Sequence, residues 1–203
     1  VLNEGIDLDV SGLIINDYEH QIQWTVGVNG AHNRNVVKKI SNVLKTMNEK
    51  NREAKFDEPL PIYEEGKSLN QVFTVRSLGI DPASGREMYL TKDGKSDYTW
   101  SAAEQVVIGD SSPKLSGSLG VNAGYKGFSL SVSCSYKLGG DLYNQSLISR
   151  VENVTGLENL DRRIHKAWQK IGDVAPYRVT VFDSRNSSYT RPTSRFIQKN
   201  NEL

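Results

Sequence analysis

The clearest pattern in the chain is the alternation of apolar and small polar side chains between residues 128 and 138. Because successive side chains point to opposite faces of a β-strand, this segment predicts a strand with one apolar and one polar face. About 11 residues, tilted by about 40°, reach a height of roughly 27 Å, close to the apolar thickness of a bilayer. The apolar positions are Phe128, Leu130, Val132, Cys134, Tyr136 and Leu138.

The segment before it, residues 115–125, carries the same alternation and predicts the partner strand of a hairpin. Tyr125, Lys126 and Gly127 form the predicted tight turn, with the glycine where a positive φ is favoured. Tyr125 and Phe128 flank this turn, and aromatic residues in that place are typical of the interface between lipid and water.

A second hairpin is predicted over residues 1–34. Apolar and polar residues alternate on both of its strands, and Asn16 with Asp17 is expected to supply the turn. Acidic and amide groups, among them Asp7 and Asp9, face away from the apolar side, as expected for the water-filled interior of a barrel. The apolar positions are Ile6, Leu8, Val10, Ile14, Ile22, Trp24, Val26 and Val28.

The periodicity becomes helical in two other places. Residues 36–47 carry apolar side chains at helical spacing and predict an amphipathic helix. A second helix is predicted from about Leu157 to Ile171, where Thr155 and Glu158 form a capping box. Short strands are predicted at Phe73, Val75 and residues 87–91.

Short turns and long connections alternate along the chain, an asymmetry typical of outer-membrane barrels with long extracellular loops. We therefore predict an all-β fold: part of a large antiparallel transmembrane β-barrel, whose long extracellular loops carry short helices. The predicted regions are a barrel hairpin at 1–34, a long loop region with an amphipathic helix and short strands at 35–112, a second barrel hairpin at 113–138, a long extracellular loop with a helix at 139–194 and the start of a further strand at 195–203.

Composition excludes several other classes. With a net charge of +1 and 24% charged residues, the chain has no field of one sign that would favour nucleic acid. A mean hydropathy of −0.51 fits wet loops and half-apolar strands, and it also fits a polar soluble β-domain. The single cysteine, Cys134, excludes an internal disulfide framework, and the three histidines are widely separated. No catalytic or nucleotide-binding motif occurs, so we expect neither an enzyme nor a cofactor or metal site.

Several short motifs follow one another in a fixed order. Residues 79–85, with the sequence Gly-Ile-Asp-Pro-Ala-Ser-Gly, and Tyr89 after them form the most distinctive one. The others lie at residues 3–7, 33–37, 108–114, 125–130, 139–144 and 193–197. Together they resemble the SusC/RagA family of TonB-dependent outer-membrane transporters, and the resemblance covers most of the chain.

The resemblance implies a plugged barrel of about 22 strands, of which about four are present, so we expect an incomplete chain from the C-terminal half of the barrel. It implies import of an oligosaccharide or peptide across the outer membrane of a Gram-negative cell. TonB would supply the energy through a segment not present here, and a SusD-like surface lipoprotein would act as a lid. Contact with outer-membrane lipid and a dimer of transporter–lipoprotein pairs are also implied.

Aromatic residues in the loops are the candidate ligand contacts, because their rings stack on sugars or pack on peptides. We select Trp100, Tyr143 and Tyr98 as substrate-binding candidates. Two other functions compete with transport: a soluble secreted β-domain that binds carbohydrate, and a structural surface protein without a ligand. Strand length and the unequal loops favour transport.

Overall fold

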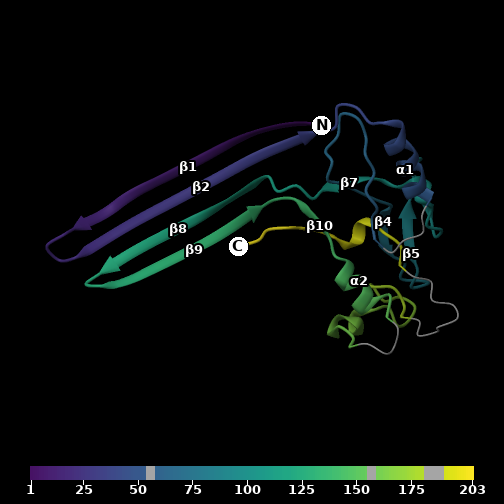
Figure 1. The fold of residues 1–203 in the computed structure, drawn as a ribbon. Coiled ribbons are helices and arrows are strands. Elements are labelled where there is room, and N and C mark those ends of the chain that lie inside the picture. The colour runs from purple at the N-terminus through teal and green to yellow at the C-terminus, as the bar shows by residue number, and fades with distance from the viewer. Residues whose placement is uncertain (54–57, 155–158, 181–189) are drawn as a thin grey trace.

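The computed structural model describes residues 1–53, 58–154, 159–180 and 190–203, and it shows a long sheet that projects from a lobe (Figure 1). All neighbouring strands of the sheet are antiparallel. The lobe comprises residues 37–114 and 139–199 as far as they are described, so the chain leaves the sheet twice at the same end. The sheet contains β1 (Leu2–Asp17), β2 (Ile22–Val36), β8 (Leu115–Tyr125) and β9 (Phe128–Leu138), in the order β1-β2-β8-β9.

The register of the sheet aligns the apolar positions of all four strands. Val10 pairs with Val28, Val28 with Leu119, and Leu119 with Cys134. Because side chains alternate along each strand, this alignment gathers the apolar residues on one face and the small polar residues on the other. Both predicted hairpins are therefore present, and they pair with each other through β2 and β8.

The first hairpin differs from the prediction at its tip. β1 continues through Asp17, so Asn16 and Asp17 are paired strand residues and do not form the turn. The turn lies at residues 18–21, where Gln21 adopts a φ of 56°. A bulge between Leu13 and Ile15 adds one residue to β1 and shifts the register there. Such a bulge can continue a strand past a break in its alternation, which the sequence pattern does not reveal.

The lobe is built from short elements. β3 pairs with β7, β4 pairs with β5 and β5 with β6, and β10 pairs with β11. The predicted short strands near Phe73 and residues 87–91 are confirmed by β3 and β5. The elements are α1 (Asn42–Glu53), β3 (Gln71–Thr74), β4 (Arg76–Ile80), β5 (Glu87–Leu90), β6 (Ser96–Asp97), η1 (Ala102–Glu104), β7 (Val106–Asp110), β10 (Asp141–Tyr143), α2 (Gln145–Val151), η2 (Arg162–Lys166), η3 (Ser194–Phe196) and β11 (Ile197–Lys199).

The first helix begins later than the apolar spacing predicts. Val36 still belongs to β2, where it pairs with Leu2, and Val37 is buried in the lobe. Ser41 fixes the start, because its hydroxyl accepts a hydrogen bond from the backbone N–H of Leu44 at 3.3 Å. The helical spacing before Ser41 therefore comes from a strand end and from a loop in which Val37 is buried.

The second predicted helix is wrong over its described part. Residues 159–171 form only the short 3-10 helix η2, and Thr155, Leu157 and Glu158 lie outside the described residues. The chain turns away because the backbone N–H of Trp168 bonds to the carbonyl of Tyr177 at 3.0 Å instead of continuing a helix. The helix of this region is α2, which begins where Asn144 Oδ1 accepts from Leu147 N–H at 2.9 Å.

The hydrophobic core belongs entirely to the lobe. Every residue of the four sheet strands is described, and none of them is buried. Inside the lobe, α2 contacts η2 and η3 and buries Ile148 and Val151. The buried apolar side chains include Val37, Ile62, Phe73, Val75, Ile148, Val151 and Phe196.

Candidate functional site

The sheet exposes apolar side chains along one whole face. Phe128 is 81% exposed, Leu130 61% and Val132 47%. Exposed apolar patches beyond a few hundred Å² are rare on soluble monomers and mark contact surfaces. The side chains of this face are therefore suited to contact with an apolar environment. Its other exposed members are Ile6, Leu8, Val10, Trp24, Val28, Leu119 and Tyr125.

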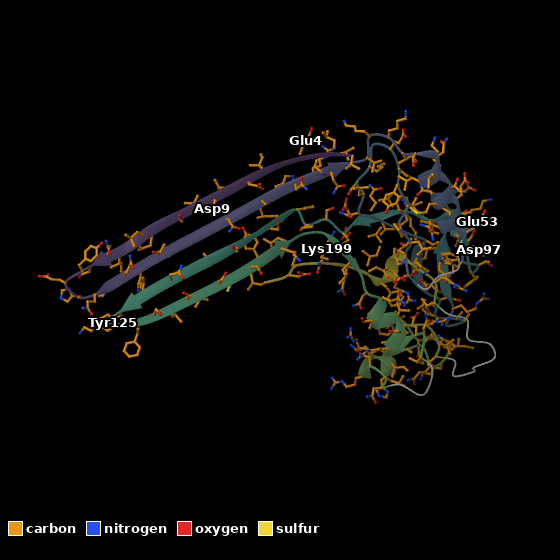
Figure 2. All side chains as sticks on the ribbon, viewed as in Figure 1. Glu4, Asp9, Glu53, Asp97, Tyr125 and Lys199 are labelled. Atoms are coloured by element: carbon orange, nitrogen blue, oxygen red, sulfur yellow. The ribbon has the colours of Figure 1, made fainter. Side chains whose placement is uncertain are left out.

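The opposite face carries small polar groups that bond across the strands. Asn29 Nδ2 donates to Ser118 Oγ at 2.7 Å, and the backbone N–H of Ser118 returns a bond to Asn29 Oδ1 at 2.8 Å. Ser131 Oγ donates to Asn122 Oδ1 at 2.7 Å. Asp9, midway along the sheet, is exposed (Figure 2). A face of amides, serines and carboxylates suits water, as the lining of an aqueous passage does.

Two carboxylates and an arginine form a buried ion cluster inside the lobe. Arg195 Nη2 lies 3.0 Å from Glu87 Oε2, and Arg195 Nη1 lies 2.7 Å from Glu152 Oε1. The side chains of Glu87 and Glu152 are only 3% and 0% exposed. Thr190 Oγ1 donates to Glu152 Oε2 at 2.5 Å, and the backbone N–H of Arg178 donates to Glu152 Oε1 at 3.0 Å. The cluster thereby joins β5, α2 and η3.

Glu152 and Arg195 compensate for each other's burial. Burial disfavours a charged Glu152, but the hydrogen bonds and positive charge of Arg195 outweigh it and hold the pKa of this carboxyl below its usual value. Burial also opposes the charge on Arg195, whose pKa is nevertheless raised by Glu152 and Glu87. Burial, reinforced by the charge of Glu87, raises the pKa of Tyr89, which therefore remains a neutral phenol. Removing one partner would leave an uncompensated buried charge.

The Gly-Ile-Asp-Pro-Ala-Ser-Gly motif forms a turn that places an aromatic ring. Asp81 accepts hydrogen bonds from the backbone N–H of Ala83 at 3.0 Å and from Ser84 Oγ at 2.6 Å. Its carboxylate also accepts from the hydroxyl of Tyr98 at 3.0 Å. The bond from Ser84, then those from Ala83 and Tyr98, lowers the pKa of Asp81. The motif therefore positions Tyr98 through a carboxylate that remains ionised.

Two of the three predicted ligand contacts, Tyr98 and Trp100, line the same cavity of about 320 Å³. The indole N–H of Trp100 donates to the carbonyl of Pro192 at 3.1 Å, which fixes the ring. The guanidinium of Arg86 lies 5.0 Å from the centre of the Tyr98 ring. The cavity thus combines aromatic and cationic groups and can take a small polar portion of a ligand. Glu87, Tyr89, Arg178 and Arg191 also line it.

Tyr143, the third predicted contact, lies elsewhere. It lines a separate cavity of about 380 Å³ together with Pro59, Pro61 and Tyr63. Its ring meets Phe196 edge-on with the ring centres 6.5 Å apart, and burial raises the pKa of its hydroxyl. The structure therefore brings together Tyr98 and Trp100 but places Tyr143 in a second cavity.

Sequence reasoning missed the ion cluster that supports the first cavity. Glu87 and Arg195 are separated by 108 positions, and Glu152 lies 43 positions before Arg195. No spacing rule connects carboxylates and guanidinium groups at such separations, because tertiary folding alone brings them together. The only available signal was the position of Arg195 within one of the family-like motifs.

Among the described residues, no group of three or more His, Cys, Asp or Glu is arranged to hold a metal ion. None of the helices described is both long enough and apolar enough to cross a membrane.

Comparisons with known proteins give structural matches only. No protein-family model and no curated protein sequence matches this chain. "Structure of the RagAB peptide transporter" matches with a TM-score of 0.72 and 19% identity. "Structure of the RagAB peptide importer in the 'open-open' state" matches with a TM-score of 0.68 and 20% identity.

Each of these alignments covers 98% of this chain and 21% of the solved chain, so this chain spans about a fifth of their length. At this identity the likeness establishes the fold. It confirms the predicted mostly β architecture with antiparallel strands, and the four-stranded sheet does not close on itself within the described residues.

Proposed function

We propose that this chain supplies wall strands and loops to an outer-membrane importer of oligosaccharides or peptides. The observation that carries the proposal is the two-faced sheet, which is apolar on one side and polar on the other over most of its length. Lipid on one side and water on the other satisfy both faces at once. The likeness to transporter structures supports the same conclusion.

The sheet favours this proposal over a soluble carbohydrate-binding domain. A sandwich would bury the apolar face against a second sheet, whereas the lobe extends from the end of the sheet and leaves that face uncovered (Figure 1). β8 and β9 each run for 11 residues without interruption, about twice the usual strand length in soluble domains.

The proposal includes partners beyond these residues. The matched structures are titled RagAB peptide transporter and importer, which favours a peptide over a sugar as cargo. The lipoprotein partner rests on the family resemblance of the sequence motifs. A SusD-like lipoprotein would cover the lobe, on the extracellular side, and TonB would act through a segment outside this chain. Pairs of transporter and lipoprotein would assemble as dimers. On this arrangement residues 35–112 and 139–194 are the extracellular loops.

In this proposal, the cavity of Tyr98 and Trp100 contacts the cargo. Both rings are held by hydrogen bonds, so they offer fixed contact area at little entropic cost. Tyr143, in the second cavity, provides a further contact for a cargo long enough to reach both.

The single cysteine allows a direct test of the membrane-spanning sheet. Cys134 lies on the apolar face, and Ser133 beside it faces the polar side. In bilayers, a charged maleimide should label Ser133→Cys in a Cys134→Ser background and leave Cys134 unlabelled in the parent protein. After the protein is unfolded in denaturant, the same charged maleimide should label Cys134, because its thiol can then ionise in water. Equal labelling of both positions by the charged reagent in bilayers would support the soluble domain and refute the proposal.

The cargo contact is tested by Trp100→Ala. We expect cells that carry it to take up labelled peptide about tenfold more slowly at low concentration, since a fixed aromatic contact is lost. Ile171→Ala is the matched control, because Ile171 is 79% exposed and lies outside both cavities. Unchanged uptake by Trp100→Ala, at equal surface expression, would remove this residue from the binding surface.

A further inference from the structure

Strands β2 and β8 separate before they reach the lobe. Their pairing stops at Ala31 and Ser116, whereas β1 and β2 remain paired as far as Leu2 and Val36. A cavity of about 340 Å³ opens where the two strands diverge. The Nδ1 atom of His32 lies 2.6 Å from the carbonyl oxygen of Lys114 and connects the two sides.

Positively charged side chains outnumber carboxylates in the lining of this cavity. Four cationic side chains line it, against two carboxylates. Arg34, Lys67 and Lys114 are exposed, and none of them makes an ion pair or side-chain hydrogen bond with any described residue. The fourth, Lys199, lies where the sheet meets the lobe (Figure 2).

The acidic groups of this cavity are already engaged. Asp141 Oδ1 pairs with Lys199 Nζ at 2.6 Å, and its other oxygen accepts from the backbone N–H of Asp110 at 3.1 Å. Asp110 Oδ1 accepts from the backbone N–H of Ser112 at 2.8 Å. Glu4 stands opposite Arg34 across the β1–β2 ladder and forms no ion pair with it. Arg34 and Lys67 therefore remain available to an external anion. So does Lys114, which forms no ion pair with a described residue, although its charge helps to lower the pKa of Asp141.

The position of these cations along the strands, relative to the exposed apolar residues, indicates how deep they lie in a membrane. Ile6 pairs with His32, and Leu115 pairs with Leu138. This row is the last one toward the lobe whose apolar side chains are exposed, since Leu2 and Val36 beyond it are half-buried. Arg34 lies two residues beyond His32, which is about 7 Å further along the strand. Basic side chains immediately beyond an apolar band lie at the depth of lipid headgroups.

We infer that the opening between β2 and β8 is a binding site for the anionic phosphate headgroup of a membrane lipid. Arg34 and Lys114 contact the phosphate from the two sides of the opening, and Lys67 contacts it from the lobe. Guanidinium and ammonium groups are the usual phosphate ligands, and the acyl chains would continue down the apolar face. The inference rests on the proposed membrane-spanning sheet.

The test uses the full protein in nanodiscs of phosphatidylcholine that contain a small fraction of phosphatidylglycerol. Native mass spectrometry measures how much phosphatidylglycerol the protein retains. We expect Arg34→Gln/Lys114→Gln to weaken retention roughly 30-fold, since two charges near a membrane surface are lost. Lys170→Gln, an exposed lysine of the lobe, should retain phosphatidylglycerol as the parent does.

Each outcome has a separate meaning. Equal loss in the Lys170→Gln control, or full retention by the double variant, would overturn the site. Displacement of the lipid by low concentrations of inorganic phosphate would also overturn it, since the opening would then be a site for a free anion. A protein that does not enter nanodiscs at all would refute the proposed function, and the lipid site with it.

Discussion

The sheet and the lobe are stabilised in opposite ways. None of the sheet residues is buried, and the sheet is held by strand pairing and by bonds between small polar groups. The lobe has a buried apolar core, and inside that core lies an ion cluster around Arg195. In our proposal the sheet needs no core of its own, because lipid covers its apolar face and water solvates its polar face.

The difference predicts which substitutions each region tolerates. In the lobe, the most sensitive positions should be those that leave a charge buried without its partner. In the sheet, they should be positions on one face only, and the neighbouring residue in sequence should tolerate the same change.

The largest effect is expected in the lobe. Arg195→Met leaves Glu87 buried without its counter-ion and leaves Glu152 with only Arg178, whose Nε lies 3.7 Å from Glu152 Oε2. It should lower the free energy of unfolding of the lobe by about 3–5 kcal/mol. Trp100 and Trp168 fluorescence during denaturation measures this. Arg163→Met is the control, because its pair with Asp161 is exposed and its loss should leave the transition midpoint unchanged. Equal midpoints for both variants would mean that the cluster does not stabilise the lobe.

A smaller effect, restricted to one face, is expected in the sheet. Val132→Arg places a charge on the apolar face and should cost about 2–4 kcal/mol on folding into bilayers, because the side chain lies near the middle of the band. Ser133→Arg points into water and should cost far less. Folding titrations into lipid vesicles measure both values. Similar costs at the two positions would contradict the assigned faces.

How far the sequence could predict the structure also differs between the two regions. The sheet was predictable because the alternation of apolar and polar side chains along a strand is a local signal. This alternation correctly predicted the strand from Phe128 to Leu138 and its apolar face. The tip of the first hairpin was not, since the bulge at Leu13 and Ile15 breaks the alternation.

The structure of the lobe could not be predicted from local patterns, because it depends on contacts between segments that are far apart in the sequence. Trp168 appeared to belong to a helix, but its indole N–H donates to the carbonyl of Pro82 at 3.0 Å, 86 positions away. A Cβ atom at Gly85 would lie 2.5 Å from the Trp168 ring, so this glycine allows the ring to approach the backbone. The same limit applies to the candidate site. The sequence identified Tyr98 and Trp100 as aromatic residues in loops. It did not predict that they line one cavity, nor that an ion cluster lies beside it.

The smallest predicted effect is a difference in acid sensitivity between the two regions. The pKa of Glu152 in the folded lobe lies below its usual value of 4.5, since Arg195 outweighs the cost of burial. A carboxyl with a lowered pKa stabilises the fold above its usual pKa, and this contribution is lost as the pH falls through the lowered value. The lobe should therefore loosen as the pH falls below about 4.5, while the sheet, which contains no buried carboxyl group, should not respond.

The three tryptophans separate the two responses. Trp24 lies in β2 and reports on the sheet, whereas Trp100 and Trp168 report on the lobe. As the pH is lowered in lipid vesicles, emission in a variant that keeps only the lobe tryptophans should shift to longer wavelength before emission in a variant that keeps only Trp24. Glu152→Gln should flatten the pH dependence of the lobe, because the titrating carboxyl is gone, and should make the lobe less stable at neutral pH. A lobe transition with an unchanged pH dependence in Glu152→Gln would assign the acid response to another carboxyl, and simultaneous shifts of both reporters would show that the sheet and the lobe unfold as one unit.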